Sequence, residues 1–432
     1  MSAAAVNTSR SSELYARAQA LLPGGVNSPV RAMRSIGRDP IFIASGQGSR
    51  IRDVDGNEYV DWVSSWGPLI LGHAHPEVIE AVIEAARGGT TFGAPTEGEV
   101  ELAAEVARRV PSVEMLRMTS SGTEAAMSAI RLARAVTGRE PVLKFAGAYH
   151  GHVDGLLAQA GSGLATQGIP ASPGVPAAVA AATVIVPWND AQALVAATER
   201  HRLAAILAEP VPANMGLVPP EPGFLALLRE RADATGALLI FDEVISGFRV
   251  ARGGAQEQFG VAPDLTILGK IIGGGLPAAA CGGPRALMER IAPAGDVYQA
   301  GTLSGNPLAV AAARATLARL DAPAYRRLAQ FTEALATGLG AVAAEAGRAV
   351  QVHSLPGLLT VFFSDSPVTD YEAAAACDLD AYGAWCRALL ERGVYPPPSQ
   401  FEAWFPSLAH TDEDAQRTLD AAREAFRELP AR

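Results

Sequence analysis

Lysine is almost absent from this 432-residue chain: lysine and arginine together number 35, and only Lys144 and Lys270 are lysines. A lysine amine can lose its proton and condense with an aldehyde, whereas a guanidinium stays protonated, so a lysine kept in such a chain is a candidate for chemistry. Lys270 follows an apolar run at 265–268 and precedes a glycine-rich turn, which predicts a position at the mouth of a sheet. Lys144 lies in the strand-like segment PVLKF, and we expect its side chain to point to solvent.

An acidic residue is predicted to meet the Lys270 amine. Asp242 and Glu243 directly follow five apolar residues, and ligands of parallel α/β sheets bind beyond the carboxyl ends of the strands. Asp242 should therefore project into the crevice that Lys270 reaches. A buried ion pair is the alternative interpretation. A magnesium-binding acid of a nucleotide site is excluded, because no G-x-x-x-x-G-K-[ST] segment occurs and Lys270 is followed by Ile271.

An anion site is predicted at the start of one helix. The segment 119–124, TSSGTE, follows a strand-like run and opens a helical pattern, so backbone N–H groups and hydroxyls converge where the helix dipole favours an anion. An ordinary helix-capping box is the alternative. A condensing lysine, an aspartate that can keep a pyridine nitrogen protonated, and a phosphate cup are together the requirements of pyridoxal 5′-phosphate (PLP). We therefore expect this cofactor.

Helical and strand-like segments alternate through the middle of the chain, which predicts βαβ units on a mostly parallel sheet. After about residue 310, alanine-rich helices and two strand-like runs indicate a smaller α+β domain. We expect an N-terminal segment at 1–70 that joins the small domain, a large α/β domain at 71–310, and the rest of the small domain at 311–432. The predicted helices of the large domain are 76–87, 97–109, 123–137, 190–200 and 222–235, and its predicted strands are 114–118, 141–145, 183–187, 204–208, 237–241 and 265–268.

The composition limits the classes of partner. The net charge is −10, and without a basic stretch the chain is a poor partner for nucleic acid or an anionic membrane. The three cysteines form no C-x-x-C pair, which is typical of a reducing compartment. Neither a signal peptide nor a membrane-spanning segment is recognisable. We therefore expect a cytoplasmic protein that acts on a small molecule.

Two further sequence patterns each allow two functional interpretations. His150, His152 and Asp154 have the H-x-H-x-D spacing of some metallohydrolases, and His73-x-His75 could add ligands, but Gly155 stands where a further histidine is needed. We therefore expect no metal.

The segment 160–176 is rich in small and turn-forming residues, so it is either an active-site lid or a plain surface loop.

Motifs along nearly the whole chain resemble one family. They resemble the fold-type I PLP enzymes of the class III aminotransferase family and, within it, the glutamate-1-semialdehyde 2,1-aminomutases. The motifs are LLPGGVNSPVRA at 21–32, WGPLILGHAHP at 66–76, SSGTEAAMSAIRLARAVTGR at 120–139, KFAGAYHGH at 144–152, EPVPANMG at 209–216, FDEVISGFRV at 241–250, TILGKIIGGGLP at 266–277, GTLSGNPLA at 301–309 and PSQFEAWF at 398–405.

This resemblance implies roles for individual residues. Lys270 would bind the cofactor aldehyde and carry protons, Asp242 would pair with the ring nitrogen, and Tyr149 would stack on the ring. The other cofactor contacts would come from Ser121, Gly122, Thr123, Val244 and, from a second subunit, Thr302, which implies a homodimer with shared sites. Substrate contacts would come from Ser28, Arg31, Trp66, Ser162, Asn214 and Glu402. The chain departs from the family pattern at Ser120, at the prolines of 396–398 and at Trp404.

The implied activity is an intramolecular amino transfer that uses PLP and its pyridoxamine form (PMP). It converts glutamate 1-semialdehyde into 5-aminolevulinate through a diamine intermediate, a step of tetrapyrrole biosynthesis. The alternative is an ω-aminotransferase that uses an amino donor and 2-oxoglutarate, but its usual arginine after Gly-Phe-Gly is missing, because Gly247-Phe248 is followed by Arg249-Val250. A third possibility, a member that binds the cofactor without catalysis, is disfavoured because Asp242 and Lys270 are both present.

Overall fold

The large domain is built on a seven-stranded sheet. The computed structural model describes residues 6–157 and 172–430. The strand order is β4-β10-β9-β8-β7-β5-β6, and only β10 runs antiparallel to its neighbours, β4 and β9. The strands are β4 (Met115–Thr119), β5 (Val142–Phe145), β6 (Thr183–Val186), β7 (Ala205–Ala208), β8 (Leu238–Glu243), β9 (Leu265–Leu268) and β10 (Ala279–Gly283).

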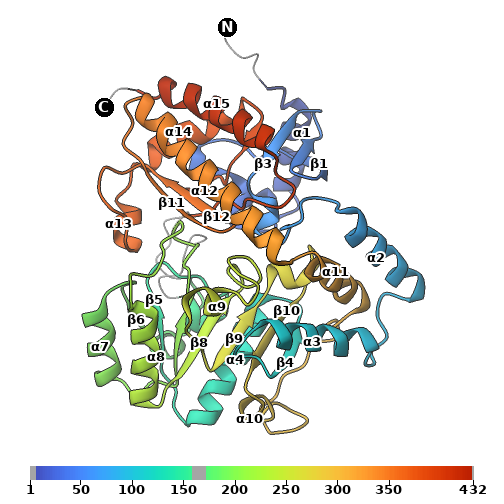
Figure 1. The fold of residues 1–432 in the computed structure, drawn as a ribbon, viewed down its shortest axis with the longest axis vertical. Helices are drawn as coiled ribbons and strands as arrows, with labels where there is room; N and C mark the ends of the chain where they lie inside the picture. Colours follow the sequence, from blue (N-terminus) through green and yellow to red (C-terminus); the bar gives the residue numbers. More distant parts are fainter. Residues whose placement is uncertain (1–5, 158–171, 431–432) are drawn as a thin grey trace.

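Helices cover both faces of this sheet (Figure 1). Along β7, Ile206 and Ala208 pack with α7 (Ala191–Arg200) and α8 (Phe224–Thr235), whereas Ala205 and Leu207 pack with α4 (Gly122–Thr137). Successive side chains of a strand point to opposite faces, so a strand covered on both sides must be apolar throughout. The other helices are α2 (Pro76–Gly88), α3 (Glu97–Arg109), α6 (Ala177–Ala180), α9 (Ala255–Phe259), α10 (Arg285–Met288) and α11 (Pro307–Ala318).

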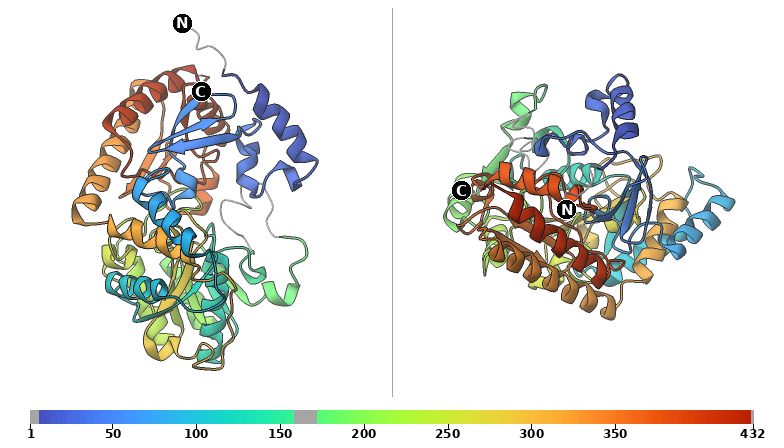
Figure 2. Two further views of the ribbon diagram at one scale, coloured as in Figure 1. Left: turned by 90° about the vertical axis from the view of Figure 1, so that its right-hand side faces the viewer. Right: turned by 90° about the horizontal axis from the view of Figure 1, so that it is seen from above.

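Both ends of the chain build the smaller domain. The N-terminal strands β1 (Ile43–Gln47), β2 (Arg50–Asp53) and β3 (Glu58–Asp61) form one sheet with β13 (Val394–Tyr395), which pairs in parallel with β3. Figures 1 and 2 show the blue N-terminal strands beside the red C-terminal helix. The other elements are α1 (Ser9–Gln19), α12 (Ala322–Glu345), the hairpin β11 (Gln351–Leu355) and β12 (Leu358–Phe362), α13 (Tyr371–Ala375), α14 (Leu379–Leu390) and α15 (Asp412–Glu428).

The predicted elements of the large domain are confirmed to within about two residues, and one strand was missed. Strand β10, with the sequence AACGG, contains no β-branched or aromatic residue, so its sequence carries no strand signal. In the N-terminal part, strand β3 ends at Asp61, and Ser64, Ser65 and Trp66 have positive φ angles and turn the chain. The domain limits at residues 70 and 310 stay a prediction.

Aromatic side chains fill the core of the small domain. Trp404 is fully buried, with its ring centroid 5.8 Å from those of Trp62 and Trp385. The departure from the family pattern at Trp404 therefore affects the packing of the core. His410 stacks on Trp62 at 4.1 Å, its Nδ1 accepts the Ser407 N–H at 3.0 Å, and its Nε2 lies 3.0 Å from the Asp61 carbonyl oxygen. This set of partners requires a neutral ring that carries its proton on Nε2.

The buried His410 ring should make the fold sensitive to mild acid. Burial lowers the pKa of His410 from 6.5 to about 4, so the unfolded chain takes up this proton at a higher pH than the folded chain does. The contribution to stability is present above about pH 6.5 and is lost as the pH falls towards 4, with a limit of about 3 kcal/mol. Urea unfolding of wild type and His410→Gln at pH 7 and pH 4.5 should show a smaller difference between the two proteins at the lower pH. The control His201→Gln, at a half-buried residue that follows α7, should keep the wild-type change of unfolding free energy with pH. A constant difference between wild type and His410→Gln would contradict the assignment.

Candidate active site

A cavity of about 740 Å³ lies at the carboxyl ends of the parallel strands. Its walls come from the segments that follow β4, β5, β7, β8 and β9, and from parts of both chain ends. This is where ligands bind in open α/β sheets. Of the residues predicted to contact the cofactor or the substrate, eleven line it: Ser28, Trp66, Ser121, Gly122, Thr123, Tyr149, Asn214, Asp242, Val244, Lys270 and Glu402.

Asp242, in the C-terminal part of β8, is held by two hydrogen-bonding partners. Its Oδ2 lies 2.8 Å from Nδ1 of His150, and its Oδ1 accepts the Val244 N–H at 3.1 Å. The Asp242 carboxyl is only 5% exposed. Burial lowers the pKa of His150, although Asp242 favours the charged imidazolium. The orientation of the Asp242 carboxylate in the cavity therefore depends on a histidine that is itself fully buried.

Lys270 begins a 3-10 helix directly after β9, with a φ of 51°. A non-glycine residue with positive φ costs about 1–3 kcal/mol, and such strain gathers at functional sites. The Lys270 Nζ donates a hydrogen bond of 2.7 Å to the Trp66 carbonyl oxygen. Burial lowers the pKa of the Lys270 amine, against the attraction of Glu402. A larger fraction of the amine is therefore neutral near pH 7, which a nucleophile or proton carrier requires.

The N-terminus of α4 faces the same cavity. Ser121 is the N-cap, and its hydroxyl accepts the Glu124 N–H, while the Glu124 carboxylate accepts the Ser121 and Ser120 N–H groups at 2.9 and 2.7 Å. The capping-box alternative is therefore correct for these atoms. The N–H groups of Gly122 and Thr123 have no acceptor within the helix and remain at its positive end. The capping hydrogen bonds therefore do not use the N–H groups that an anion would contact.

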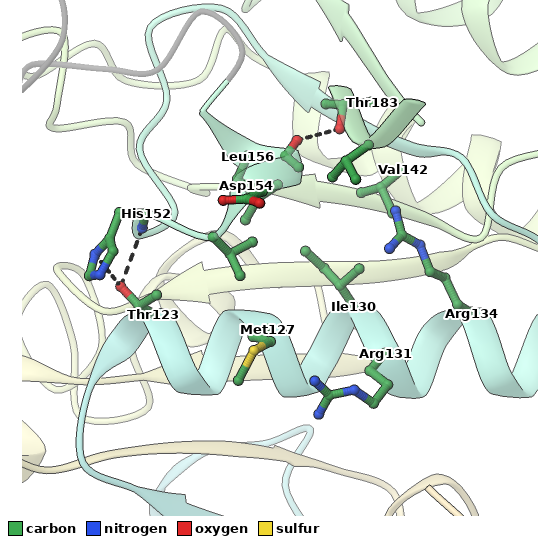
Figure 3. A pocket seen from close by; sticks show the side chains of 13 residues that line it. Thr123, Met127, Ile130, Arg131, Arg134, Val142, His152, Asp154, Leu156 and Thr183 are labelled. Carbon is green, nitrogen blue, oxygen red and sulfur yellow. Dashed lines mark hydrogen bonds between the residues drawn. The ribbon is translucent and has the colours of Figure 1, made fainter. Parts of the chain in front are cut away.

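A loop after β5 carries three of the cavity side chains: Tyr149, His150 and His152. Figure 3 shows the far side of this loop, with His152 hydrogen-bonded to Thr123 of α4 and Thr183 of β6 hydrogen-bonded to the loop next to Leu156. The Tyr149 N–H donates to Glu209 Oε1 at 2.8 Å. The loop is thus attached to several strands and to α4.

The position of Lys144 differs from the one that we expected from the sequence. Its side chain is fully buried, and its Nζ donates to the carbonyl oxygens of Ala148 and Leu156 at 3.0 and 3.1 Å, beneath the loop that carries Tyr149. The prediction that it points to solvent was wrong. Strand β5 lies between β6 and β7, and all four of its residues are buried, so neither side of the strand faces solvent. Burial lowers the pKa of Lys144 to about 8.

Glu209 is a site residue that sequence reasoning missed. It directly follows β7, and its carboxyl accepts hydrogen bonds from the Tyr149 N–H, the Ala213 N–H and the Asn214 amide. Burial, and then the charge of Asp242, raises the pKa of Glu209 to about 8. The signal was present, because an acid at the end of an apolar strand is the pattern that singled out Asp242.

Two predicted residues are not among the described residues that line the cavity, and a third lies outside the described part of the chain. Arg31 is exposed in the 3-10 helix Pro29–Ala32, although the preceding residues, Asn27–Val30, do line it. Thr302 is exposed in a turn. Ser162, like most of the segment 160–176, lies outside the described residues. The roles of these residues, and of the segment as a lid, stay predictions.

The histidine patterns do not converge on a metal site. His150 contacts Asp242, whereas His73 pairs with Asp61 at 2.7 Å in the small domain. In residues 6–157 and 172–430, no group of three or more His, Cys, Asp or Glu side chains could hold a metal ion. Across the same residues, no helix combines the length and the apolar character that crossing a membrane requires.

The contact between the loop and α4 can be tested by adding one methyl group. Gly151 has a φ of +84°, and a Cβ there would lie 2.7 Å from the Thr123 Cα. Gly151→Ala should lower the free energy of unfolding by about 2–4 kcal/mol through strain and the clash. The matched control is Gly138→Ala at the other end of α4, where φ is +63° and the space is open, so only the strain of about 1 kcal/mol should appear. Equal losses in urea unfolding would contradict the contact.

Comparison with known proteins places this geometry in a family. The class III aminotransferase family matches residues 33–426. The chain is 55% identical over 425 residues to glutamate-1-semialdehyde 2,1-aminomutase 2 of Brevibacillus brevis, covering 98% of this chain and 99% of the relative. Among solved structures, an omega-transaminase from Sphaerobacter thermophilus has a TM-score of 0.90 and 36% identity, covering 97% of each chain. A glutamate-1-semialdehyde-aminomutase from Pseudomonas aeruginosa PAO1 in complex with PMP has a TM-score of 0.86 and 30% identity, covering 98% of this chain and 95% of the other. The fold, the cavity at the strand ends and these similarities agree: the chain belongs to the class III aminotransferase family.

Proposed function

We propose that the cavity holds PLP and its pyridoxamine form. The residues fit this group: Asp242 would hold the ring nitrogen, Tyr149 and Val244 would flank the ring, and Ser121, Gly122 and Thr123 would hold the phosphate. The positive end of α4 suits a phosphate, and the carboxylate suits a protonated pyridine nitrogen. When bound, this cofactor supplies an electron-accepting ring that stabilises negative charge on an attached carbon.

The reaction we propose is the conversion of glutamate 1-semialdehyde into 5-aminolevulinate by intramolecular amino transfer. The observation that carries it is the placement of Lys270, Asp242 and Glu402 around one cavity in a chain that is 55% identical, over nearly its full length, to an aminomutase. Lys270 would accept and return the proton that the amino transfer moves, because burial favours its neutral amine. Ser28, Trp66, Asn214 and Glu402 would surround the substrate, since they line the same cavity.

The rival, an ω-aminotransferase that uses 2-oxoglutarate, needs a cation free to bind a second carboxylate. Arg249 is 1% exposed and is not among the cavity-lining residues. Its guanidinium donates to the carbonyl oxygens of Gly67 and Gly357 and lies 5.1 Å from the centre of the Phe405 ring. These contacts occupy the arginine that follows Gly247-Phe248 and favour the aminomutase.

One assay separates the possible activities. Purified protein loaded with PMP is incubated with the semialdehyde alone, without an added amino donor or acceptor, and 5-aminolevulinate is measured. Many turnovers per active site support the aminomutase, and Lys270→Ala should remove them. Turnover that requires a donor and an oxo-acid would instead indicate the aminotransferase. Bound cofactor with no product in either assay would indicate a silent member.

Arg31 should contribute to the binding of the substrate carboxylate. A guanidinium that pairs with a carboxylate contributes about 1.5–3 kcal/mol, so Arg31→Met should raise KM by about 10- to 100-fold. The matched control is Arg34→Met, because Arg34 is exposed in the next 3-10 helix and does not line the cavity. Steady-state kinetics of both variants check this. Similar KM values for Arg31→Met and wild type would remove Arg31 from the site.

We also propose a homodimer in which Thr302 reaches the cavity of the second copy. Thr302 is exposed, and its neighbour Leu303 is 52% exposed. Gly305 of the same turn lies against Glu99, next to Val100, which is 69% exposed. Exposed apolar side chains on two neighbouring segments support an interaction surface.

Three buried free cysteines fit the cytoplasmic location that we propose.

A charge on this surface should separate the copies. Leu303→Asp would place a carboxylate in the proposed interface, and sedimentation velocity should show a shift from dimer to monomer. Because Thr302 would then be lost from the neighbouring site, PLP should bind at least about tenfold more weakly. The control Leu21→Asp, at a residue that is 80% exposed after α1, should leave both quantities unchanged. A dimer that survives in Leu303→Asp with unchanged affinity would contradict the proposed surface.

A further inference from the structure

The second lysine of the chain lies beneath the candidate site but does not line its cavity. Lys144 is fully buried, and its Nζ donates to the carbonyl oxygens of Ala148 and Leu156 at 3.0 and 3.1 Å. These two residues mark the ends of the loop that carries Tyr149, His150 and His152. One amine therefore joins both ends of the loop to strand β5, whereas the other contacts each hold a single point of it.

Those other contacts show what the loop must position. His150 reaches Asp242 at 2.8 Å, the Tyr149 N–H reaches Glu209 at 2.8 Å, and the His152 N–H reaches Thr123 at 3.3 Å. On the outer side, the Thr183 hydroxyl donates to the Gly155 carbonyl oxygen. Thr183 and Gly155 line a hollow of about 530 Å³, and Figure 3 shows Thr183 among the residues around it. On this side the loop therefore borders open space, and its hydrogen bonds act together with the packing of Ala148, Val153 and Leu156 in the apolar core.

We propose that Lys144 is a positioning residue, whose amine clamps the two ends of the loop 148–156 and so holds Tyr149 and His150 in register with Asp242. The expected effect on cofactor binding rests on the proposed function. The clamp itself does not, because it consists of contacts within the protein chain. A neutral amine has two N–H groups and an ammonium has three, so both forms can serve the two carbonyl oxygens.

The composition supports this role. The chain has arginine at all but two of its Lys and Arg positions, yet it has lysine here. A compact amine on a flexible stem can turn its donors towards two carbonyl groups, whereas the planar guanidinium presents a larger, rigid fork. At a fully buried position of β5, between β6 and β7, that larger group has no solvent into which it can extend.

Hydrogen exchange of the cofactor-free protein tests the clamp directly. Lys144→Met keeps the length of the side chain and removes both hydrogen bonds, so amides in the segment 146–157, including those of Tyr149 and His152, should exchange at least about tenfold faster. The matched control is Thr332→Val, which removes a buried hydroxyl that donates to the Leu328 carbonyl oxygen and accepts the Gly357 N–H in the small domain. It should leave 146–157 unchanged. Unchanged exchange in Lys144→Met, or equal acceleration in both variants, would overturn the proposal.

Cofactor affinity provides a second test of the clamp. PLP should bind Lys144→Met about tenfold more weakly, with an altered absorbance spectrum, because His150 no longer holds Asp242 in place. Lys144→Gln, which keeps two amide N–H donors on a shorter stem, should lie between Lys144→Met and wild type. Wild-type affinity and spectrum in Lys144→Met would count against the proposal. Exchange rates do not depend on the reaction, so failure of the aminomutase assay would leave the clamp intact.

A labelling experiment applies even if neither Lys144 variant folds. In Lys270→Ala, Lys144 is the sole lysine, so every lysine adduct formed by an amine-acylating reagent reports on this one side chain. A clamped, buried Lys144 amine should react at least about a hundredfold more slowly in the folded protein than in the same protein unfolded in urea. Equal rates of Lys144 labelling in the two states would overturn the proposal. The N-terminal amine, whose ordinary pKa is lower than that of a lysine, serves only as an internal check on the reagent.

Discussion

A buried carboxylate must be kept in one orientation at the bottom of a crevice, and much of the site is arranged around that requirement. Asp242 is 5% exposed and has a histidine on one oxygen and a backbone N–H on the other. Removing a charge from water is costly unless hydrogen bonds replace the solvent, and these two partners do so. His150 in turn depends on its loop, and the loop depends on Lys144, Glu209 and Thr123.

Burial also makes the ionisable groups around the cavity depend on one another. It lowers the pKa of both lysines and raises that of Glu209, while the charges of Glu209 and Glu402 oppose these effects on Lys144 and Lys270 respectively. Such coupled groups share protons as a set. A site of this kind can move a proton over a short distance near neutral pH, which suits a reaction that rearranges one substrate and consumes no second one.

The cavity also depends on how the two domains meet. Trp66 and Glu402 come from opposite ends of the chain, yet both line it, and the Trp66 carbonyl oxygen accepts the Lys270 hydrogen bond. Arg249 of the large domain donates to Gly67 and Gly357 and lies over the Phe405 ring, so it ties the two domains together behind the lysine. These contacts give the arginine next to the site a structural role.

The sequence by itself determined the alternation of helices and strands, the turn that presents Lys270, and the meeting of Lys270, Asp242 and the α4 N-terminus. These features are encoded locally: side-chain periodicity, helix caps and glycine turns act over a few residues, and parallel strands bring their carboxyl ends to one edge. Only the tertiary structure decided that Lys144 is buried, that Glu209 and His150 join the site, and that Trp404 belongs to the core. Each of these depends on which strand lies beside which, because a strand such as β5 has no exposed face once sheet neighbours and helices enclose it, and a four-residue pattern cannot show that enclosure.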